Sequence, residues 1–263
     1  LVVSEAAPKK SMGQHWLNDE FSLEAICEAA AVTSDDVVLE IGPGLGSLTK
    51  LLVSKAKRVI AIEFDEKLAA ALPMRIGADN LEVLSQDILT FDFTTMPANY
   101  KIIANIPYYL TNNLIRAISE TPNSPQVAAI LVQKEVAQRA AAKPGDMSLL
   151  SVTAQYYWEV SLGEEVAAEL FTPPPKVNSQ ILIMNYRSKP LFDDVDERAF
   201  FRVVKSGFAQ RRKTLLNSLS NGLHIDKETI EKICNQHGID AGRRAQTLSL
   251  QEWHNLYTSL NIK

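Results

Sequence analysis

The chain has 263 residues, of which 46% are hydrophobic and 22% are charged, and its formal net charge is −4 at pH 7. This composition excludes a disordered or collagen-like chain, and the length suits one large domain or two smaller ones. The longest clean apolar run, Val127–Val132, is far shorter than the roughly 18 residues of a membrane helix, and no signal-peptide pattern opens the sequence. We therefore expect a cytoplasmic protein with no membrane partner. Cys27 and Cys234 are far apart and lack a CxxC or His-rich partner, so we expect neither a disulfide nor a bound metal.

The negative total hides an uneven distribution of charge along the chain. Residues 1–186 hold 14 basic and 22 acidic side chains, whereas residues 187–263 hold 13 basic and nine acidic ones, so the net charges are −8 and +4. An acidic total by itself argues against a nucleic-acid partner, whose phosphates need cations. The basic C-terminal part removes that objection.

The predicted elements begin with an α/β region. Up to residue 186, short β-branched runs alternate with helical periodicity, which predicts a seven-stranded, mostly parallel sheet covered by helices. The expected strands are Val37–Ile41, Val59–Glu63, Leu81–Leu84, Lys101–Ala104, Ala128–Val132, Glu159–Leu162 and Gln180–Tyr186. The expected helices are Leu23–Ala30, Ser47–Ala56, Glu66–Met74, Asn112–Ser119, Glu135–Ala142 and Leu149–Tyr156. Three prolines at residues 173–175 prevent a crossover helix before the last strand, so the last two strands should pair antiparallel at the sheet edge.

A helical region follows. After Pro190 the strand pattern stops, and helices are expected near Glu197–Ala209, Arg212–Ser220, Lys227–Gln236 and Leu250–Leu260. We therefore predict an α/β domain over residues 1–188 and a small all-α domain over residues 189–263.

A glycine-rich turn, Gly42-Pro-Gly-Leu-Gly46, follows the first predicted strand, where an open parallel sheet leaves a ligand crevice. Alone it is also typical of an ordinary tight turn. However, Glu63 ends the second strand and suits two ribose hydroxyls, and Asp87 ends the third and can accept from an adenine amine. A nicotinamide dinucleotide or S-adenosylmethionine fits this pattern. The glycine spacing is one residue shorter than the dinucleotide fingerprint, and the acidic domain attracts a cationic sulfonium, so the sequence favours S-adenosylmethionine.

The fourth predicted strand ends in Asn105-Ile-Pro-Tyr108, at the same edge of the sheet. A site that methylates a nucleobase amine must accept hydrogen bonds from the amine and hold its nitrogen in line with the methyl donor. Asn105 offers a side-chain carbonyl and Ile106 a backbone carbonyl. Pro107 fixes the backbone, and Tyr108 gives a flat face for an extruded base. The motif contains no His or Lys, in keeping with a reaction that needs no strong general base.

These motifs resemble the ribosomal RNA adenine-N6,N6-dimethyltransferases, and the resemblance covers nearly the whole chain. Further matching segments are Gly13-Gln-His-Trp-Leu17, Gln133-Lys-Glu-Val136, Phe171-Thr-Pro-Pro-Pro-Lys-Val177, Arg211-Arg-Lys-Thr-Leu215 and Arg243-Arg-Ala-Gln-Thr-Leu-Ser249. The last two resemble the bacterial small-subunit members rather than the large-subunit erythromycin-resistance enzymes. The resemblance implies a Rossmann-like methyltransferase that uses S-adenosylmethionine. It also implies dimethylation of two adjacent adenosines in small-subunit (16S) ribosomal RNA during subunit biogenesis.

Carried over by position, the resemblance implies roles for individual residues. The implied cofactor site comprises His15, Leu17, Gly42, Gly44, Glu63, Asp87, Ile88 and Asn105. The implied catalytic residues are Asn105, Pro107, Tyr108 and Phe171. The target adenine would lie between the rings of Tyr108 and Phe171. His15 stands where the family usually has Asn.

The C-terminal part contains a run of cations without acids. On a helix over residues 197–209, Arg198, Arg202 and Lys205 fall at i, i+4 and i+7 opposite an apolar stripe. The triplet 211–213 lies near a helix N-terminus, where the helix dipole disfavours cations. Charge placed against local stability indicates a phosphate-binding surface. The predicted ribosomal RNA contacts are Arg198, Arg202, Lys205, Arg211, Arg212, Lys213, Arg243 and Arg244.

Three other functions fit part of the pattern. The tail motifs disfavour a large-subunit adenine methyltransferase of the macrolide-resistance type. Intact Asn105, Pro107 and Tyr108 disfavour a non-catalytic ribosome-assembly factor. The glycine spacing disfavours a nicotinamide-dependent dehydrogenase. We expect a monomer that binds ribosomal RNA in the small subunit.

Overall fold

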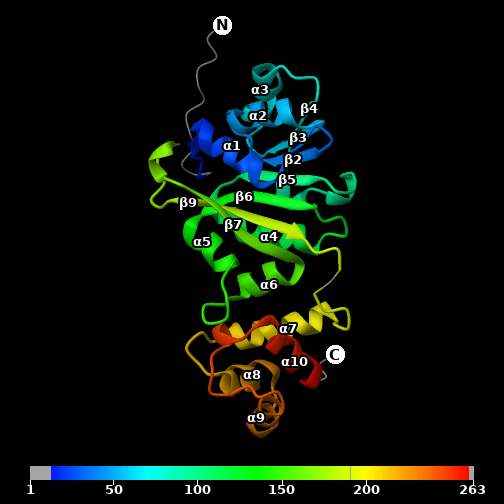
Figure 1. Ribbon diagram of the computed structural model, residues 1–263, viewed down its shortest axis with the longest axis vertical. Helices are drawn as coiled ribbons and strands as arrows, with labels where there is room; N and C mark the ends of the chain where they lie inside the picture. The colour runs from blue at the N-terminus through cyan, green and yellow to red at the C-terminus, as the bar shows by residue number, and fades with distance from the viewer. Residues whose placement is uncertain (1–12, 190, 261–263) are drawn as a thin grey trace. The chain divides into compact units, whose positions relative to one another are not determined.

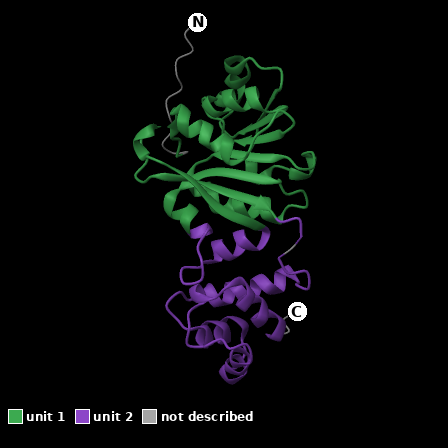
Figure 2. Ribbon diagram, viewed as in Figure 1, with its two compact units in different colours: residues 1–138, 158–186 green, residues 139–157, 187–263 purple. Residues whose placement is uncertain are grey.

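The computed structural model describes residues 13–189 and 191–260 (Figure 1). These residues form two compact units, which Figure 2 shows in different colours. Within the described part, unit 1 comprises residues up to 138 and residues 158–186, and unit 2 comprises residues 139–157 and those from 187 onwards. Each unit has a hydrophobic core of its own.

Unit 1 is built on a seven-stranded sheet with the order β4-β3-β2-β5-β6-β9-β7. Its strands are β2 (Val37–Ile41), β3 (Arg58–Glu63), β4 (Leu81–Ser85), β5 (Lys101–Asn105), β6 (Val127–Gln133), β7 (Trp158–Val166) and β9 (Ser179–Tyr186). The first five pair parallel, whereas β9 pairs antiparallel with both β6 and β7. The predicted seven strands and the antiparallel pair at the edge are confirmed.

Helices cover this sheet, and local chemistry sets where they begin. They are α1 (Glu20–Ala29), α2 (Ser47–Lys55), α3 (Glu66–Ile76), α4 (Thr111–Glu120) and α5 (Lys134–Ala140). The side chains of Asp19 and Asp65 cap α1 and α3 by accepting from backbone amides of the first turn. Helix α2 begins instead after Gly46, whose φ of 90° is left-handed. A Cβ at Gly46 would lie 2.8 Å from the Leu72 side chain, so glycine is needed there for both conformation and space.

A second sheet of two short strands was not predicted. Strand β1 (Trp16–Leu17) pairs antiparallel with β8 (Phe171–Thr172), with Trp16 opposite Thr172 and Leu17 opposite Phe171. Strands of two residues are too short to show a period-2 pattern, so the sequence could not indicate them. This pairing brings the N-terminal Gly13–Leu17 motif beside the Phe171 motif.

Unit 2 is helical. It contains α6 (Leu149–Tyr157), α7 (Glu197–Phe208), α8 (Leu215–Leu223), α9 (Lys227–Gln236) and α10 (Leu250–Leu260). Its division from unit 1 differs from the expected boundary at residue 188, because residues 139–157 join the C-terminal helices. The reason is packing: Val152 and Tyr156 of α6 are buried in the helical core, where the Tyr156 ring lies 5.2 Å from that of Phe200.

Helix α8 begins three residues later than predicted. Thr214 is its N-cap, with extended backbone angles and a hydroxyl that accepts from the Asn217 amide. The cations at residues 211–213 therefore precede the helix and its cap rather than occupying its first turn.

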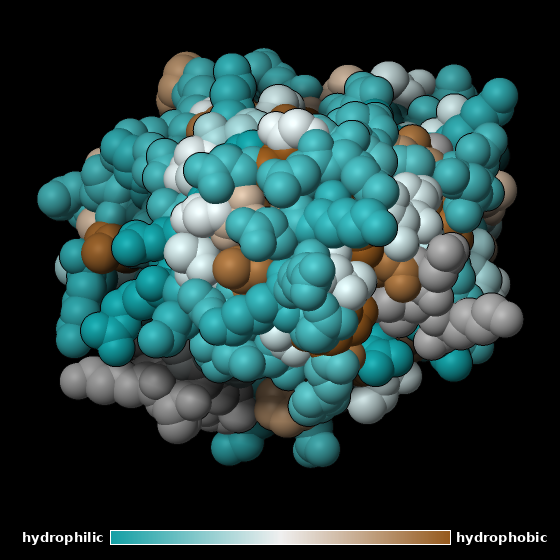
Figure 3. All heavy atoms as spheres, turned by 90° about the horizontal axis from the view of Figure 1, so that it is seen from below, coloured by the Kyte–Doolittle hydropathy of each residue, from teal (hydrophilic) through white to brown (hydrophobic). Residues whose placement is uncertain are grey.

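Figure 3 shows one face of the molecule, on which hydrophilic residues dominate. Hydrophobic residues form small separate spots on this face. In residues 13–189 and 191–260, no helix is both long and apolar enough to cross a membrane. Cys27 and Cys234 are buried free thiols, and the described residues include no cluster of three or more potential metal ligands of the His, Cys, Asp and Glu types.

Candidate active site

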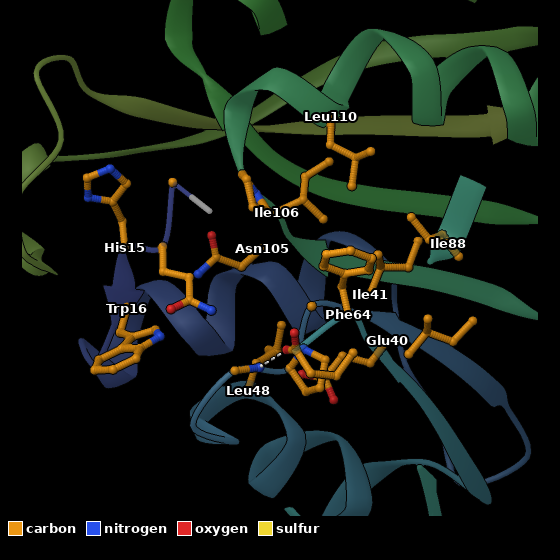
Figure 4. A pocket seen from close by; sticks show the side chains of 18 of the residues that line it. His15, Trp16, Glu40, Ile41, Leu48, Phe64, Ile88, Asn105, Ile106 and Leu110 are labelled. Carbon is orange, nitrogen blue, oxygen red and sulfur yellow. Dashed lines mark hydrogen bonds between the residues drawn. The ribbon is translucent and has the colours of Figure 1, made fainter. Parts of the chain in front are cut away.

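A pocket in unit 1 brings the sequence motifs together (Figure 4). It has a volume of about 200 Å³ and lies at the carboxyl ends of β2, β3 and β5. In the strand order, the chain continues from β2 to β3 towards one edge of the sheet and from β5 to β6 towards the other edge. Open α/β sheets bind ligands at the point where this direction switches. All residues predicted for the cofactor and for catalysis line this pocket: His15, Leu17, Gly42, Gly44, Glu63, Asp87, Ile88, Asn105, Pro107, Tyr108 and Phe171.

The glycine turn is held in place by Glu63. Gly42 and Gly44 have φ values of 70° and 56°, a left-handed conformation that favours glycine. The Gly44 amide donates to Glu63 Oε2 at 3.0 Å, and the Asp65 amide donates to Glu63 Oε1 at 2.9 Å. Burial raises the pKa of the Glu63 carboxyl, while the amide hydrogen bonds oppose the shift. Each carboxylate oxygen accepts one of these bonds and keeps a further acceptor site for a ligand hydroxyl.

Asp87 is also fixed by a backbone amide. Its Oδ1 accepts from Leu89 at 2.9 Å and caps a 3₁₀ turn over Ile88–Thr90. Ile88, inside this turn, is buried and lines the pocket. Within the described residues, Asp87 Oδ2 has no hydrogen-bond partner and is left to accept from a ligand.

The Asn105–Tyr108 motif crosses from a strand to a tight turn. Asn105 is the last residue of β5, and its side-chain amide makes no hydrogen bond within the described part of the chain. Pro107, with a φ of −55°, starts a 3₁₀ turn over Tyr108–Leu110, and its carbonyl accepts from the Leu110 amide at 3.0 Å. The motif thus presents Asn105 to the pocket on a rigid backbone (Figure 4).

Tyr108 is anchored by Ser179, a residue that the sequence did not single out. The two hydroxyls share a hydrogen bond of 2.8 Å, and Ser179 is fully buried in β9. Burial raises the pKa of the Tyr108 phenol, and the bond to Ser179 opposes that shift. Phe171 lines the same pocket, but its ring makes no contact with that of Tyr108 in the described structure.

His15 lies beside Tyr108. The two rings are nearly parallel, with an angle of 21° between their planes and 6.2 Å between their centroids. His15 Nδ1 is 2.7 Å from the Pro173 carbonyl oxygen, and since a carbonyl only accepts, Nδ1 carries the hydrogen. The 105–108 motif contains no histidine, yet the β1–β8 pairing supplies one to the same site. No local spacing in the sequence could have indicated this contact.

Glu40 is a buried acid that sequence reasoning did not assign. It precedes the glycine turn on β2, lines the pocket and is 0% exposed, and neither of its carboxyl oxygens has a hydrogen-bond partner in the described structure. Burial raises the pKa of this carboxyl to about 8. The Thr49 hydroxyl opposes the shift but does not reach hydrogen-bonding geometry, so burial dominates.

The predicted RNA contacts of unit 2 divide into two groups. Seven of the eight are exposed and form no ion pair within the described residues: Arg198, Arg202, Lys205, Arg211, Arg212, Lys213 and Arg244. Arg243 differs, because its guanidinium contacts Glu252 at 2.5 Å and donates to the Thr247 carbonyl at 2.6 Å. Its carbonyl also accepts from the Leu215 amide at 2.8 Å, which brings Arg244 close to the start of α8. We therefore interpret Arg243 as a structural residue of unit 2.

We expect Glu40 to make the stability of the protein depend on pH. Its pKa in the folded protein, about 8, lies above the ordinary value of 4.5, so the folded chain keeps a proton that the unfolded chain loses between these values. Stability should therefore fall as the pH rises through this window. Glu40→Gln, which stays neutral, should gain at least about 1 kcal/mol relative to wild type between pH 5 and 9. Thermal unfolding across this pH range measures the difference, with exposed Glu164→Gln as the control. A difference that does not change with pH would show that Glu40 is already ionised.

Comparisons with known proteins agree over almost the whole chain. The family model described as "Ribosomal RNA adenine dimethylase" matches residues 6–261. A ribosomal RNA small subunit methyltransferase A of Dehalococcoides mccartyi is 40% identical over 253 residues, which cover 93% of this chain and 86% of the relative.

Two solved structures share the fold over nearly all of this chain. A dimethyladenosine transferase from Plasmodium falciparum has a TM-score of 0.77 and 25% identity, covering 93% of this chain and 97% of the other. The 23S rRNA methyltransferase ErmE has a TM-score of 0.75 and 28% identity, with coverage of 94% and 99%. With the pocket described above, these matches show that the chain belongs to the ribosomal RNA adenine dimethylase family.

Proposed function

We propose that this protein transfers methyl groups from S-adenosylmethionine to N6 of two adjacent adenosines in the RNA of the small ribosomal subunit. The observation that carries the proposal is a single pocket that joins the glycine turn and its acids to the Asn105–Tyr108 motif. One part of this pocket suits a nucleoside cofactor and the other suits an extruded base. The small-subunit name of the Dehalococcoides relative supports the choice of RNA.

The residues of the pocket fit a cationic cofactor better than a pyrophosphate. Its lining includes the carboxyl groups of Glu63 and Asp87, the carboxyl of Glu40, whose raised pKa keeps it mostly protonated at neutral pH, and no Lys or Arg of the described chain. Within the described part of the chain, two buried polar groups of the lining also lack partners, the Glu40 carboxyl and the Trp16 indole nitrogen. Bound S-adenosylmethionine would supply an electrophilic methyl group. Glu63 would accept hydrogen bonds from the ribose hydroxyls and Asp87 from the adenine amine. The glycines of the turn have no side chains and so leave room for the cofactor.

The remaining residues act on the target base. The lone pair of the exocyclic amine is delocalised into the ring, so the nitrogen becomes nucleophilic when it turns more tetrahedral. Hydrogen-bond acceptors for the amine hydrogens favour that geometry. The side-chain oxygen of Asn105 is such an acceptor, and Pro107 fixes the direction of the neighbouring backbone. Tyr108, tied to Ser179 by its hydroxyl, provides a flat face on which the base stacks. Phe171 would cover the opposite face of the base.

Unit 2 supplies the cationic surface in this proposal. Helix α7 carries Arg198, Arg202 and Lys205 on its exposed side, and the loop 209–213 continues the cations towards α8. Exposed cations without acidic partners are available to phosphates, whereas Arg243 is occupied by Glu252. We also propose that the protein acts as a monomer in the cytoplasm.

The decisive experiment is a methyl-transfer assay with three RNA substrates. The protein is incubated with radiolabelled S-adenosylmethionine and unmethylated small subunits, large subunits or bare ribosomal RNA, and the labelled nucleoside is identified. We expect N6,N6-dimethyladenosine in small subunits. Label in large subunits instead would favour an activity like that named for ErmE, and binding without label would favour a non-catalytic assembly factor.

The stacking role of Tyr108 predicts a selective loss. Tyr108→Ala should lower methyl transfer to small subunits at least about a hundredfold, because an unstacked base is not held in line with the donor. Calorimetry should find its affinity for S-adenosylmethionine close to that of wild type. Tyr108→Phe loses only the anchor to Ser179 and should lose less activity. Near-normal turnover of the Ala variant would refute the stacking role.

The cationic surface predicts salt-dependent binding. Reversal of Arg211, Arg212 and Lys213 to Glu should weaken binding to small subunits at least about tenfold at physiological salt and reduce the slope of log affinity against log salt concentration by roughly one per lost phosphate contact. Reversal of Lys227 and Lys232, which are exposed on α9, controls for most of the change in net charge. If the triple variant binds and methylates as wild type does, the phosphate contacts lie elsewhere.

A further inference from the structure

Tyr109 stands out at the rim of the pocket. It lines the pocket directly after Tyr108 but is 69% exposed. Within the described residues, its ring has no aromatic partner and its hydroxyl makes no hydrogen bond. A large aromatic side chain exposed at the rim of a binding site is placed where its flat face can contact a bound ligand.

The local backbone explains why Tyr108 and Tyr109 face different directions. Both lie in the 3₁₀ turn over Tyr108–Leu110, where three residues complete a turn and successive side chains point about 120° apart. Because Ser179 holds the Tyr108 hydroxyl inside the protein, Tyr109 faces outward. The two rings therefore cannot stack on the same base.

Gly13 lies near the Tyr109 ring. Its φ of 62° is left-handed, and a Cβ built on it would lie 3.8 Å from both Cδ1 and Cε1 of Tyr109. The N-terminal motif therefore passes close to the ring, which itself stays exposed at the rim of the pocket.

Other exposed apolar side chains do not share this position. Phe64, 62% exposed, also lines the pocket, but it follows Glu63 and so belongs to the cofactor side. Met74 is 86% exposed on α3 and does not line the pocket. Tyr109 is the exposed aromatic residue that adjoins the proposed base-binding residue.

We propose that Tyr109 is a stacking platform for the nucleotide next to the adenosine in the pocket, that is, for the other adenosine of the target pair. This inference rests on the proposed function. Extrusion of one adenosine leaves its neighbour without a stacking partner on that side. The neighbour is joined to the extruded nucleotide by one phosphodiester and so stays close to the rim of the pocket, where Tyr109 lies. A ring at this place replaces the lost stacking and helps to present each adenosine of the pair in turn.

The test compares Tyr109→Ala and Tyr109→Phe with wild type and with Met74→Ala, an exposed apolar control outside the pocket. Loss of one base stack predicts that Tyr109→Ala lowers kcat/KM for unmethylated small subunits at least about fivefold. Tyr109→Phe keeps the ring and should recover most of this loss, because the hydroxyl has no partner. Affinity for S-adenosylmethionine in the absence of RNA, measured by calorimetry, should stay at the wild-type value in both variants. Thermal unfolding verifies that each variant is folded.

Each contrary outcome has a separate meaning. Wild-type kcat/KM in Tyr109→Ala overturns the platform, and so does an equal loss in Tyr109→Phe, because the hydroxyl rather than the ring would then matter. A matching loss of S-adenosylmethionine affinity also overturns it, because Tyr109 would then act through the cofactor. If wild type itself forms no dimethyladenosine in small subunits, the proposed function fails, and the inference fails with it.

Discussion

The hydrogen bonds that the Glu63 carboxylate accepts from Gly44 and Asp65 hold the sheet edge on which the pocket depends. The Gly44 bond ties the turn after β2 to the end of β3, and the Asp65 bond holds the residue that caps α3. Bonds to an ionised acceptor are among the stronger ones in proteins, and two amides at this edge would otherwise lose a partner. The same carboxylate keeps acceptor sites for a ligand. The turn and the proposed cofactor site therefore depend on one side chain, so replacement of Glu63 would disturb both.

The other side of the pocket is assembled from distant segments by short contacts. Strands β1 and β8 bring His15 to the Pro173 carbonyl, and β9 brings Ser179 to the Tyr108 hydroxyl. These contacts hold aromatic rings in fixed orientations before a base arrives. A preorganised site loses less entropy on binding than a mobile one, and alignment of the amine with a methyl donor tolerates little displacement. The small second sheet thus helps to fix the position of the His15 ring beside Tyr108.

Charge is sorted between the parts of the chain in a way that matches their proposed ligands. The carboxyl groups of Glu63 and Asp87 line the pocket of unit 1, whereas the exposed cations of α7, of residues 211–213 and of Arg244 in unit 2 form no ion pair within the described residues. A cationic cofactor needs acidic groups and an anionic RNA needs basic groups, and the two kinds of group lie on separate surfaces. Arg243 differs from these cations, because its guanidinium is paired with Glu252 inside unit 2.

The sequence by itself determined the seven strands, their mostly parallel pairing and the strand-end residues Gly42, Glu63, Asp87 and Asn105. It could do so because buried strands have a clear apolar pattern and because the carboxyl ends of parallel strands share one edge. The roles of His15 and Phe171 rested on family resemblance. Only the tertiary structure decided that His15 lies beside Tyr108, that Ser179 anchors Tyr108, that Glu40 is buried without a partner among the described residues and that residues 139–157 pack with the C-terminal helices. Each of these depends on contacts between segments far apart in the chain, which leave no periodicity or spacing in the sequence, whereas strands and turns are specified by residues that are close together in it.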